Sequence, residues 1–267
     1  MNTLIPMHFT ANYLLNPTNP VTVNLIGAGG TGSAMLTNLL KIHHSLKAFD
    51  HPGLHVTGFD DDIITQANQG RQLFADCEVG LHKCVALINR INCFEGTNWK
   101  AMPLKYGKDR NGWAVGQAYA NITISCVDTI SARFDIADVL WEAEGNNCHR
   151  RDQCYYWLDC GNAKFTGQVV LSTVGEIKQP ESKQYKPVGL LPMVTDEFYD
   201  LLLSQDETSV PSCSTAEALE KQDLFINPSI AEIGATLLWH LFRKGMTQNR
   251  VIFHNLESMH TTAIKVA

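Results

Sequence analysis

The chain has 267 residues, of which 45% are hydrophobic and 18% are charged, and its formal net charge is −6 at pH 7. These values suit one α/β domain over residues 1–267. The negative charge and the lack of a Lys/Arg block argue against nucleic acid as the main partner, and no apolar run is long enough to predict a membrane span. No basic segment opens the chain and its eight cysteines form no C-x-x-C pair, so we expect a cytoplasmic protein with reduced thiols.

The first half of the chain, residues 21–145, alternates apolar strand-like segments with segments of helical periodicity. The predicted strands are 21–27, 55–60, 99–104 and 120–128, and the predicted helices are 32–44, 79–94 and 131–144. We expect the first strand to be buried on both faces apart from Asn24. Because strands that alternate with helices pair in parallel, this half predicts a Rossmann-like, mainly parallel sheet with helices on both faces.

The second half, residues 152–267, has a different pattern. Two short strands, 155–159 and 167–172, follow one another closely, and a strongly apolar helix at 226–242 precedes strands at 251–253 and 262–266. This order predicts an antiparallel C-terminal extension of the sheet. Residues 176–215 are polar, weakly periodic and interrupted by prolines, so we expect a long crossover loop with one short helix at 197–203.

The segment from Val23 to Ser33 carries the strongest functional signal, because an apolar strand enters a glycine cluster and a helix leaves it. Glycines let the backbone approach phosphate groups, and a helix N-terminus offers unpaired N–H groups and positive dipole charge. The segment therefore predicts a cradle for nucleotide phosphates, made by Gly27, Gly29, Gly30 and Gly32. Many Rossmann-like proteins share this loop, so it does not identify the nucleotide by itself.

Charged residues after the glycine loop narrow the prediction. Asp60 ends the second predicted strand and Asp128 ends the fourth, which places both carboxylates at the edge of the sheet where the glycine loop lies. Asp60 suits a ribose hydroxyl pair, whereas Asp128 suits either a Mg²⁺ ion or the N-cap of the next helix. Arg71 and Lys83 suit phosphate oxygens. An NAD site has no evident use for these cations, but a site that brings two anions together does.

The order of these motifs resembles that of the ThiF/MoeB/HesA superfamily of adenylating enzymes, which are related to ubiquitin-activating enzymes. The motifs are G-x-G-G-x-G-S, an acidic strand end, N-x-x-R-Q, G-x-x-K and a strand that ends in Asp. The similarity continues through 158–169 and 227–231, and so covers residues 20–265. Within the superfamily, segments 211–214 and 222–225 are most similar to ThiF-like proteins of bacterial PRTRC gene clusters.

This resemblance implies ATP-dependent adenylation of the C-terminal carboxylate of a small ubiquitin-like protein that ends in glycine, with ATP and Mg²⁺ as cofactors and a homodimer as the assembly. Carried over by motif position, it implies that Asp60 binds the ribose and that Asp128 binds the metal. The residues implied to contact phosphate are Asn68, Arg71 and Lys83, and Gln72 and Thr129 beside these motifs complete the predicted binding set. The implied catalytic set contains Arg71, Lys83 and Asp128.

Cys213 is the fourth candidate catalytic residue. Its setting, Pro-x-Cys-Ser, is similar to the P-x-C-T setting of thioester-forming cysteines in ubiquitin-activating relatives. A loop cysteine without a role is the alternative. Four other cysteines lie in or beside apolar patterns, and we expect them to be buried; they are Cys77, Cys84, Cys93 and Cys126.

Three features depart from the family pattern. The interval from Gly32 to Asp60 is longer than usual, which leaves Asp61 and Asp62 as alternatives for the ribose ligand. No Lys or Arg precedes Lys41, so we do not expect an N-terminal arginine donated by a partner subunit. The paired C-x-x-C zinc motif of several relatives is absent. Two alternative functions stay open, a non-catalytic nucleotide-binding scaffold and an NAD-dependent oxidoreductase.

Overall fold

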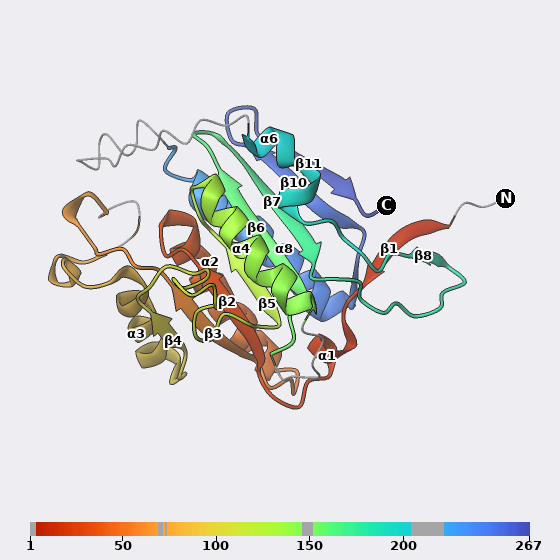
Figure 1. Ribbon diagram of the computed structural model, residues 1–267, viewed down its shortest axis with the longest axis horizontal. Helices are drawn as coiled ribbons and strands as arrows, with labels where there is room; N and C mark the ends of the chain where they lie inside the picture. The colour runs from red at the N-terminus through yellow and green to blue at the C-terminus, as the bar shows by residue number, and fades with distance from the viewer. Residues whose placement is uncertain (1–3, 69–71, 73, 146–151, 204–221) are drawn as a thin grey trace.

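The computed structural model describes residues 4–68, 72, 74–145, 152–203 and 222–267. A mixed sheet of eight strands, in the order β11-β10-β7-β6-β5-β2-β3-β4, forms its centre (Figure 1). The strands of the parallel part are β2 (Val21–Ile26), β3 (Leu54–Phe59), β4 (Lys100–Met102), β5 (Ile122–Ser125) and β6 (Tyr156–Asn162). The antiparallel part adds β7 (Thr166–Thr173), β10 (Asn249–Asn255) and β11 (His260–Lys265). The predicted parallel sheet with an antiparallel C-terminal extension is confirmed.

Helices cover both faces of this sheet, as the sequence predicts. One apolar core joins the sheet to α2 (Gly30–Lys47), α3 (Lys83–Glu95) and α8 (Ile226–Lys244). A second core on the other face contains α4 (Ile130–Gly145) and the start of α5 (Val194–Glu197), with α6 (Tyr199–Leu203) beside them. Figure 1 shows α4 on the near face of the sheet and α8 on the far face. No described helix combines the length and the apolar character that crossing a membrane requires.

The third helix begins later than the periodicity of 79–94 predicts. Residues before Lys83 pair instead with the segment that follows β3: the Ile64 N–H donates to the Leu81 carbonyl at 2.9 Å, and Ile63 forms a bridge with His82. The Lys83 N–H then donates to the carbonyl of Asp62 at 3.0 Å. Long-range pairing thus overrides the local helical pattern and places Lys83 at the first turn of α3.

Two sequence expectations about burial are wrong. Asn24 is buried rather than exposed, because its amide donates to the carbonyls of Gln117 at 2.9 Å and Ala118 at 2.8 Å. Cys77 and Cys93 are exposed rather than buried, because they lie on a surface turn and on the outer side of α3. Cys84 is buried as expected, whereas Cys126 is only partly buried.

A second, three-stranded sheet in the order β8-β1-β9 has no counterpart in the sequence analysis. It contains β8 (Tyr185–Pro187) from the predicted crossover loop, β1 (Ile5–Phe9), which follows the N-terminus, and β9 (Met246–Thr247) after α8; the short α1 (Asn12–Leu15) follows β1. The predicted helix at 197–203 is two short helices, α5 and α6. The described part of the crossover is therefore more structured than its composition predicts.

His8 joins the small sheet to the large one. Its Nδ1–H donates to the Val188 carbonyl at 2.6 Å, and its Nε2 accepts the hydroxyl of Tyr156 at 2.9 Å. The Tyr156 oxygen also accepts the N–H of Ala11 at 2.9 Å. Burial lowers the pKa of His8 from its usual 6.5 and so favours the neutral imidazole in the folded protein.

This burial gives a pH dependence to stability. Because the unfolded chain protonates His8 below pH 6.5 while the folded chain resists it, the free energy of unfolding should fall as pH drops below 6.5. Thermal unfolding between pH 8 and pH 5 measures this slope. In His8→Gln the slope should be smaller than in the wild-type protein, and equal slopes in the two proteins would contradict the assignment.

Candidate functional site

The glycine loop lies between β2 and α2, at the edge of the sheet where the parallel strands end. β2 has β3 on one side and β5 on the other, so the loop sits at the point where the strand order reverses, which is the usual ligand position in open α/β sheets. Gly27 has φ +90° and donates its N–H to the Phe59 carbonyl at 2.8 Å. The loop therefore occupies the predicted position.

Close packing explains three of the four glycines. A Cβ on Gly27 would lie 2.6 Å from the Cys126 carbonyl oxygen, and a Cβ on Gly32 would lie 1.9 Å from the carbonyl oxygen of Gly27. A Cβ on Gly30 would lie 2.7 Å from the side chain of Asn227. Gly29 differs, because a Cβ there would meet no atom within 4 Å. This open space lies at the N-cap of α2, which has no side-chain cap and no acidic residue in its first turn. A helix N-terminus of this kind favours an anion over a cation.

Asp60 forms a hydrogen bond with the backbone of the glycine loop. Its Oδ2 accepts the N–H of Ala28 at 2.6 Å, and its Oδ1 accepts the N–H of Asp62 at 2.9 Å. Burial raises the pKa of Asp60, and the Ala28 N–H and the Lys83 ammonium act in the opposite direction. Of the three consecutive aspartates, Asp60 is the one that contacts the loop, which favours it over Asp61 and Asp62 as the ribose ligand.

Lys83 extends the same set of contacts. Its Nζ donates to the carboxylate of Asp62 at 2.6 Å, and its side chain is 9% exposed whereas that of Asp62 is 66% exposed. The buried ammonium is thus paired with a carboxylate that faces solvent. Asp60, Asp62 and Lys83 form one connected polar group beside the glycines.

Two residues of the N-x-x-R-Q motif, Asn68 and Gln72, lie in the described part of the chain. Asn68 uses its side-chain oxygen to hold its own turn, accepting the N–H of Thr65 at 2.8 Å and the Thr65 hydroxyl at 3.0 Å. Gln72 is buried, and its Oε1 has no hydrogen-bond partner among the described residues. Within the described residues no hydrogen bond joins either side chain to the glycine loop. Arg71 and Cys213 lie outside the described residues, and their roles stay predictions.

Asp128 follows β5 on the other side of the loop. The Cys126 N–H donates to the Ile26 carbonyl at 2.8 Å, which ties this segment to the end of β2. Asp128 is exposed, and its carboxylate has no hydrogen bond or ion pair to any described residue. The Thr129 hydroxyl, by contrast, accepts the N–H of Ala132 at 3.3 Å and so caps α4. Thr129, and not Asp128, is therefore the N-cap residue of α4, and the Asp128 carboxylate is not used to cap the helix.

Sequence reasoning missed two polar groups beside the loop. In one, the Asn227 oxygen of α8 accepts the Thr31 hydroxyl at 2.8 Å and the Asn162 amide at 3.3 Å. In the other, buried Arg133 of α4 pairs with buried Asp159 of β6. A polar residue inside the apolar run 155–160 is the sequence signal for the second group, but no sequence rule identifies its partner.

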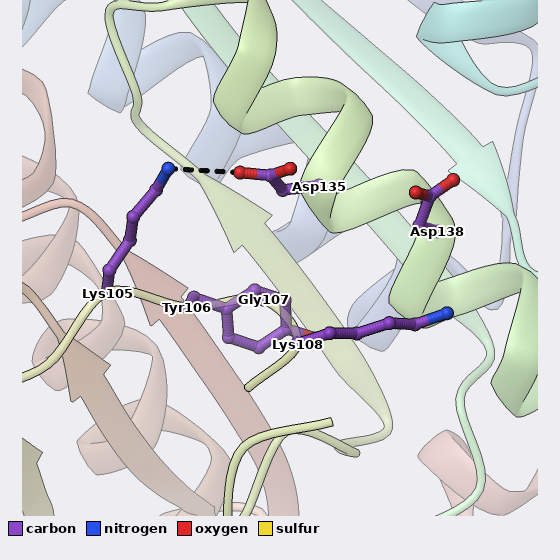
Figure 2. A pocket seen from close by; sticks show the side chains of 6 residues that line it. All are labelled: Lys105, Tyr106, Gly107, Lys108, Asp135 and Asp138. Carbon is purple, nitrogen blue, oxygen red and sulfur yellow. Dashed lines mark ion pairs between the residues drawn. The ribbon is translucent and has the colours of Figure 1, made fainter. Parts of the chain in front are cut away.

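A small pocket lies elsewhere, beside α4. It has a volume of about 170 Å³ and is lined by Lys105, Tyr106, Gly107, Lys108, Asp135 and Asp138 (Figure 2). The Lys105 ammonium pairs with the Asp135 carboxylate at 3.0 Å across it. None of the predicted site residues lines this pocket, so it is separate from the candidate site. The described residues contain no cluster of three His, Cys, Asp or Glu side chains suited to a metal.

The sheet order, the glycine loop at its switch point and the helices on both faces define a Rossmann-like α/β protein. The ThiF family model matches residues 15–266, and the chain therefore belongs to the ThiF family. The resemblance inferred from the motifs is thus confirmed at the level of the family. A comparison with curated protein sequences gives no match.

Solved structures of similar fold include E. coli MccB with selenomethionine-labelled MccA, at a TM-score of 0.58 and 15% identity over 96% of this chain. E. coli MccB with ATP matches at a TM-score of 0.53 and 14% identity over 95% of this chain. The chain spans 65% of the length of each of these MccB chains. PaaA matches at a TM-score of 0.57 and 12% identity, over 95% of this chain and 74% of its own. These similarities support the assigned fold.

Proposed function

We propose that this protein binds ATP and uses it to adenylate the C-terminal carboxylate of a peptide or protein. The observation that carries the proposal is the polar group on the glycine loop. The Asp60 carboxylate accepts hydrogen bonds from the N–H groups of Ala28 and Asp62, and the Lys83 ammonium donates to the carboxylate of Asp62. Membership of the ThiF family supports it. So does the similarity in fold to MccB, which has been solved with ATP and with MccA.

The chemistry fits residues of these types. A carboxylate is already ionised at neutral pH, so no general base is needed. One carboxylate oxygen forms a bond to the α-phosphorus of ATP, and the bond from that phosphorus to the bridging oxygen breaks, so that pyrophosphate leaves with the electron pair. The barrier lies in aligning two anions and stabilising the leaving group, for which N–H groups and cations are suited. The N-terminus of α2 and Lys83 would serve these purposes, together with Arg71.

Mg²⁺ fits the donor set as part of this proposal. Asp128 offers a hard oxygen ligand that is exposed and without a partner among the described residues, and Mg²⁺ usually takes one or two carboxylates together with phosphate oxygens. Asp128 would hold the ion, which when bound would neutralise charge on the departing pyrophosphate.

The finer features of the proposal concern the substrate and the later steps. We propose a small ubiquitin-like protein ending in glycine as the substrate, with Cys213 as the thiol that accepts the acyl group in a second step and a homodimer as the assembly. The motif resemblance supports these features. MccB solved with MccA supports the broader class of peptide carboxylates.

The test is ATP–pyrophosphate exchange catalysed by the full chain. The probe is a peptide library with free C-terminal carboxylates that includes glycine-ending members, and the matched control is the same library with C-terminal amides. We expect exchange with the carboxylates only, because an amide nitrogen is a poor nucleophile toward phosphorus at neutral pH. Calorimetry with ATP and with NAD accompanies it, and ATP should bind more tightly.

Two results would contradict the proposal. Tight binding of NAD with weak binding of ATP would favour the oxidoreductase alternative. The scaffold alternative would be favoured if the protein binds ATP but catalyses exchange neither with this library nor with a ubiquitin-like protein encoded by a neighbouring gene.

A further inference from the structure

The ion pair between Arg133 and Asp159 is buried beside the candidate site. Arg133 lies in the first turn of α4 and Asp159 lies on β6, and their side chains are 6% and 1% exposed. The Arg133 Nε lies 3.1 Å from both carboxylate oxygens of Asp159. The same carboxylate accepts the Ser125 hydroxyl at 2.6 Å, and the Ser125 oxygen accepts the indole N–H of Trp157 at 2.8 Å. Two neighbouring strands therefore fix the carboxylate that anchors the guanidinium.

The other two nitrogens of the guanidinium hold the backbone on either side of Asp128. Nη2 of Arg133 donates to the carbonyl of Val127 at 3.0 Å, and Nη1 donates to the carbonyl of Thr129 at 3.3 Å. Because the guanidinium is planar and rigid, these two bonds fix the spacing and direction of the two carbonyls together. The peptide units that flank Asp128 are thus held from the interior while the Asp128 carboxylate is exposed.

The surroundings are shaped to keep the guanidinium in this position. A Cβ on Gly161 would lie 2.7 Å from Nη2 of Arg133, so the glycine leaves the space that the guanidinium occupies. β5 ends at Ser125, and the carbonyls of Val127 and Thr129 lie beyond the strand. Arg133 supplies donors to both of these carbonyls.

Stability alone does not account for this arrangement. Removing two charges from water is energetically costly, and buried ion pairs can often be replaced by apolar side chains of similar volume without loss of stability. What apolar side chains cannot supply is the pair of directed bonds to the carbonyls around Asp128. The geometry therefore points to a role in orienting that residue.

We infer that Arg133 is a positioning residue, which acts through the backbone of residues 127–129 to aim the Asp128 carboxylate at a Mg²⁺ ion on the ATP phosphates. This inference rests on the proposed function. Groups that orient a metal ligand typically contribute about 10- to 100-fold to metal affinity. A lysine at position 133 keeps the charge beside Asp159 but cannot form the planar fork to two carbonyls.

The test compares Arg133→Lys with Arg250→Lys, a matched control. Arg250 is also a buried arginine paired with a carboxylate, that of Glu197, and the described residues show no contact between it and a site residue. Calorimetry of ATP is performed with Mg²⁺ and with EDTA, and thermal unfolding reports stability. We expect Arg133→Lys to lose about 10- to 100-fold in the affinity that Mg²⁺ adds, with little change in EDTA. Arg250→Lys should lose stability without losing the contribution of Mg²⁺.

Asp128→Asn separates the failure of this inference from failure of the proposed function. If wild-type protein binds no ATP, or if Asp128→Asn keeps the full contribution of Mg²⁺, the proposed site itself is wrong and the inference falls with it. If Asp128→Asn loses that contribution and Arg133→Lys keeps it, only the inference is overturned. Equal losses in Arg133→Lys with and without Mg²⁺, matched by Arg250→Lys, would show that Arg133 has a structural role alone.

Discussion

Replacing Asp128 with Asn should reduce the rate of ATP–pyrophosphate exchange by about 10²–10³-fold, the usual cost of losing one electrostatic contact to the transition state. The substitution keeps the size of the side chain and removes its charge. Because Asp128 is exposed and makes no described hydrogen bond or ion pair, the midpoint of thermal unfolding should not change. Exchange rates with the carboxylate peptide library measure the first effect, and calorimetric scans measure the second.

The matched control for this prediction is Asp138→Asn. Asp138 is an exposed carboxylate on α4 that lines the pocket of Figure 2 and belongs to no predicted site. Its loss changes the net charge by the same amount and should leave exchange unaffected. An exchange rate in Asp128→Asn equal to that of the control would remove Asp128 from the proposed mechanism.

Two alanine substitutions in the glycine loop should fail in different ways. In Gly32→Ala, a Cβ 1.9 Å from the Gly27 carbonyl oxygen forces backbone to move, so we expect a loss of about 1–3 kcal/mol in stability together with loss of ATP binding. In Gly29→Ala the Cβ meets no protein atom within 4 Å, so stability should change by less than about 0.5 kcal/mol. That methyl group occupies the space proposed for phosphate, and ATP affinity should fall about tenfold, which corresponds to about 1.4 kcal/mol.

Gly116→Ala serves as the control, since a Cβ there also meets no atom within 4 Å and the residue has no predicted role. Chemical denaturation gives the stability of each variant, and calorimetry gives its affinity for ATP. If Gly29→Ala binds ATP as tightly as Gly116→Ala does, the phosphates do not lie at the N-terminus of α2.

Much of the candidate site can be predicted from sequence because its residues sit at strand ends. The end of a parallel strand is visible as the end of an apolar run, and all such ends meet at one edge of the sheet. For this reason the glycine loop, Asp60 and Asp128 can be grouped from the sequence alone. The motif order identifies Lys83, whereas periodicity predicts too early a start for its helix, because residues 80–82 pair with 63–64.

Burial on individual faces cannot be predicted as well, because it depends on what packs against each face. Asn24 reads as a polar interruption in a strand, yet the carbonyls of Gln117 and Ala118, which are 93 and 94 residues away, satisfy its amide in the interior. Cys77 and Cys93 lie in or beside apolar patterns in the sequence, yet both are exposed.

The fold class, the position of the glycine loop and the family can all be predicted from the amino-acid sequence, because periodicity, glycine spacing and motif order are local properties of the chain. Which carboxylate contacts the loop, and which helix residue donates to the backbone around Asp128, depend on contacts between distant parts of the chain. The Asp60 bond to Ala28 spans 32 residues, and the pairing of Arg133 with Asp159 spans 26. The sheet order brings such partners together, and a charge in the water-free interior requires a counter-charge. Neither condition can be inferred from a local sequence pattern.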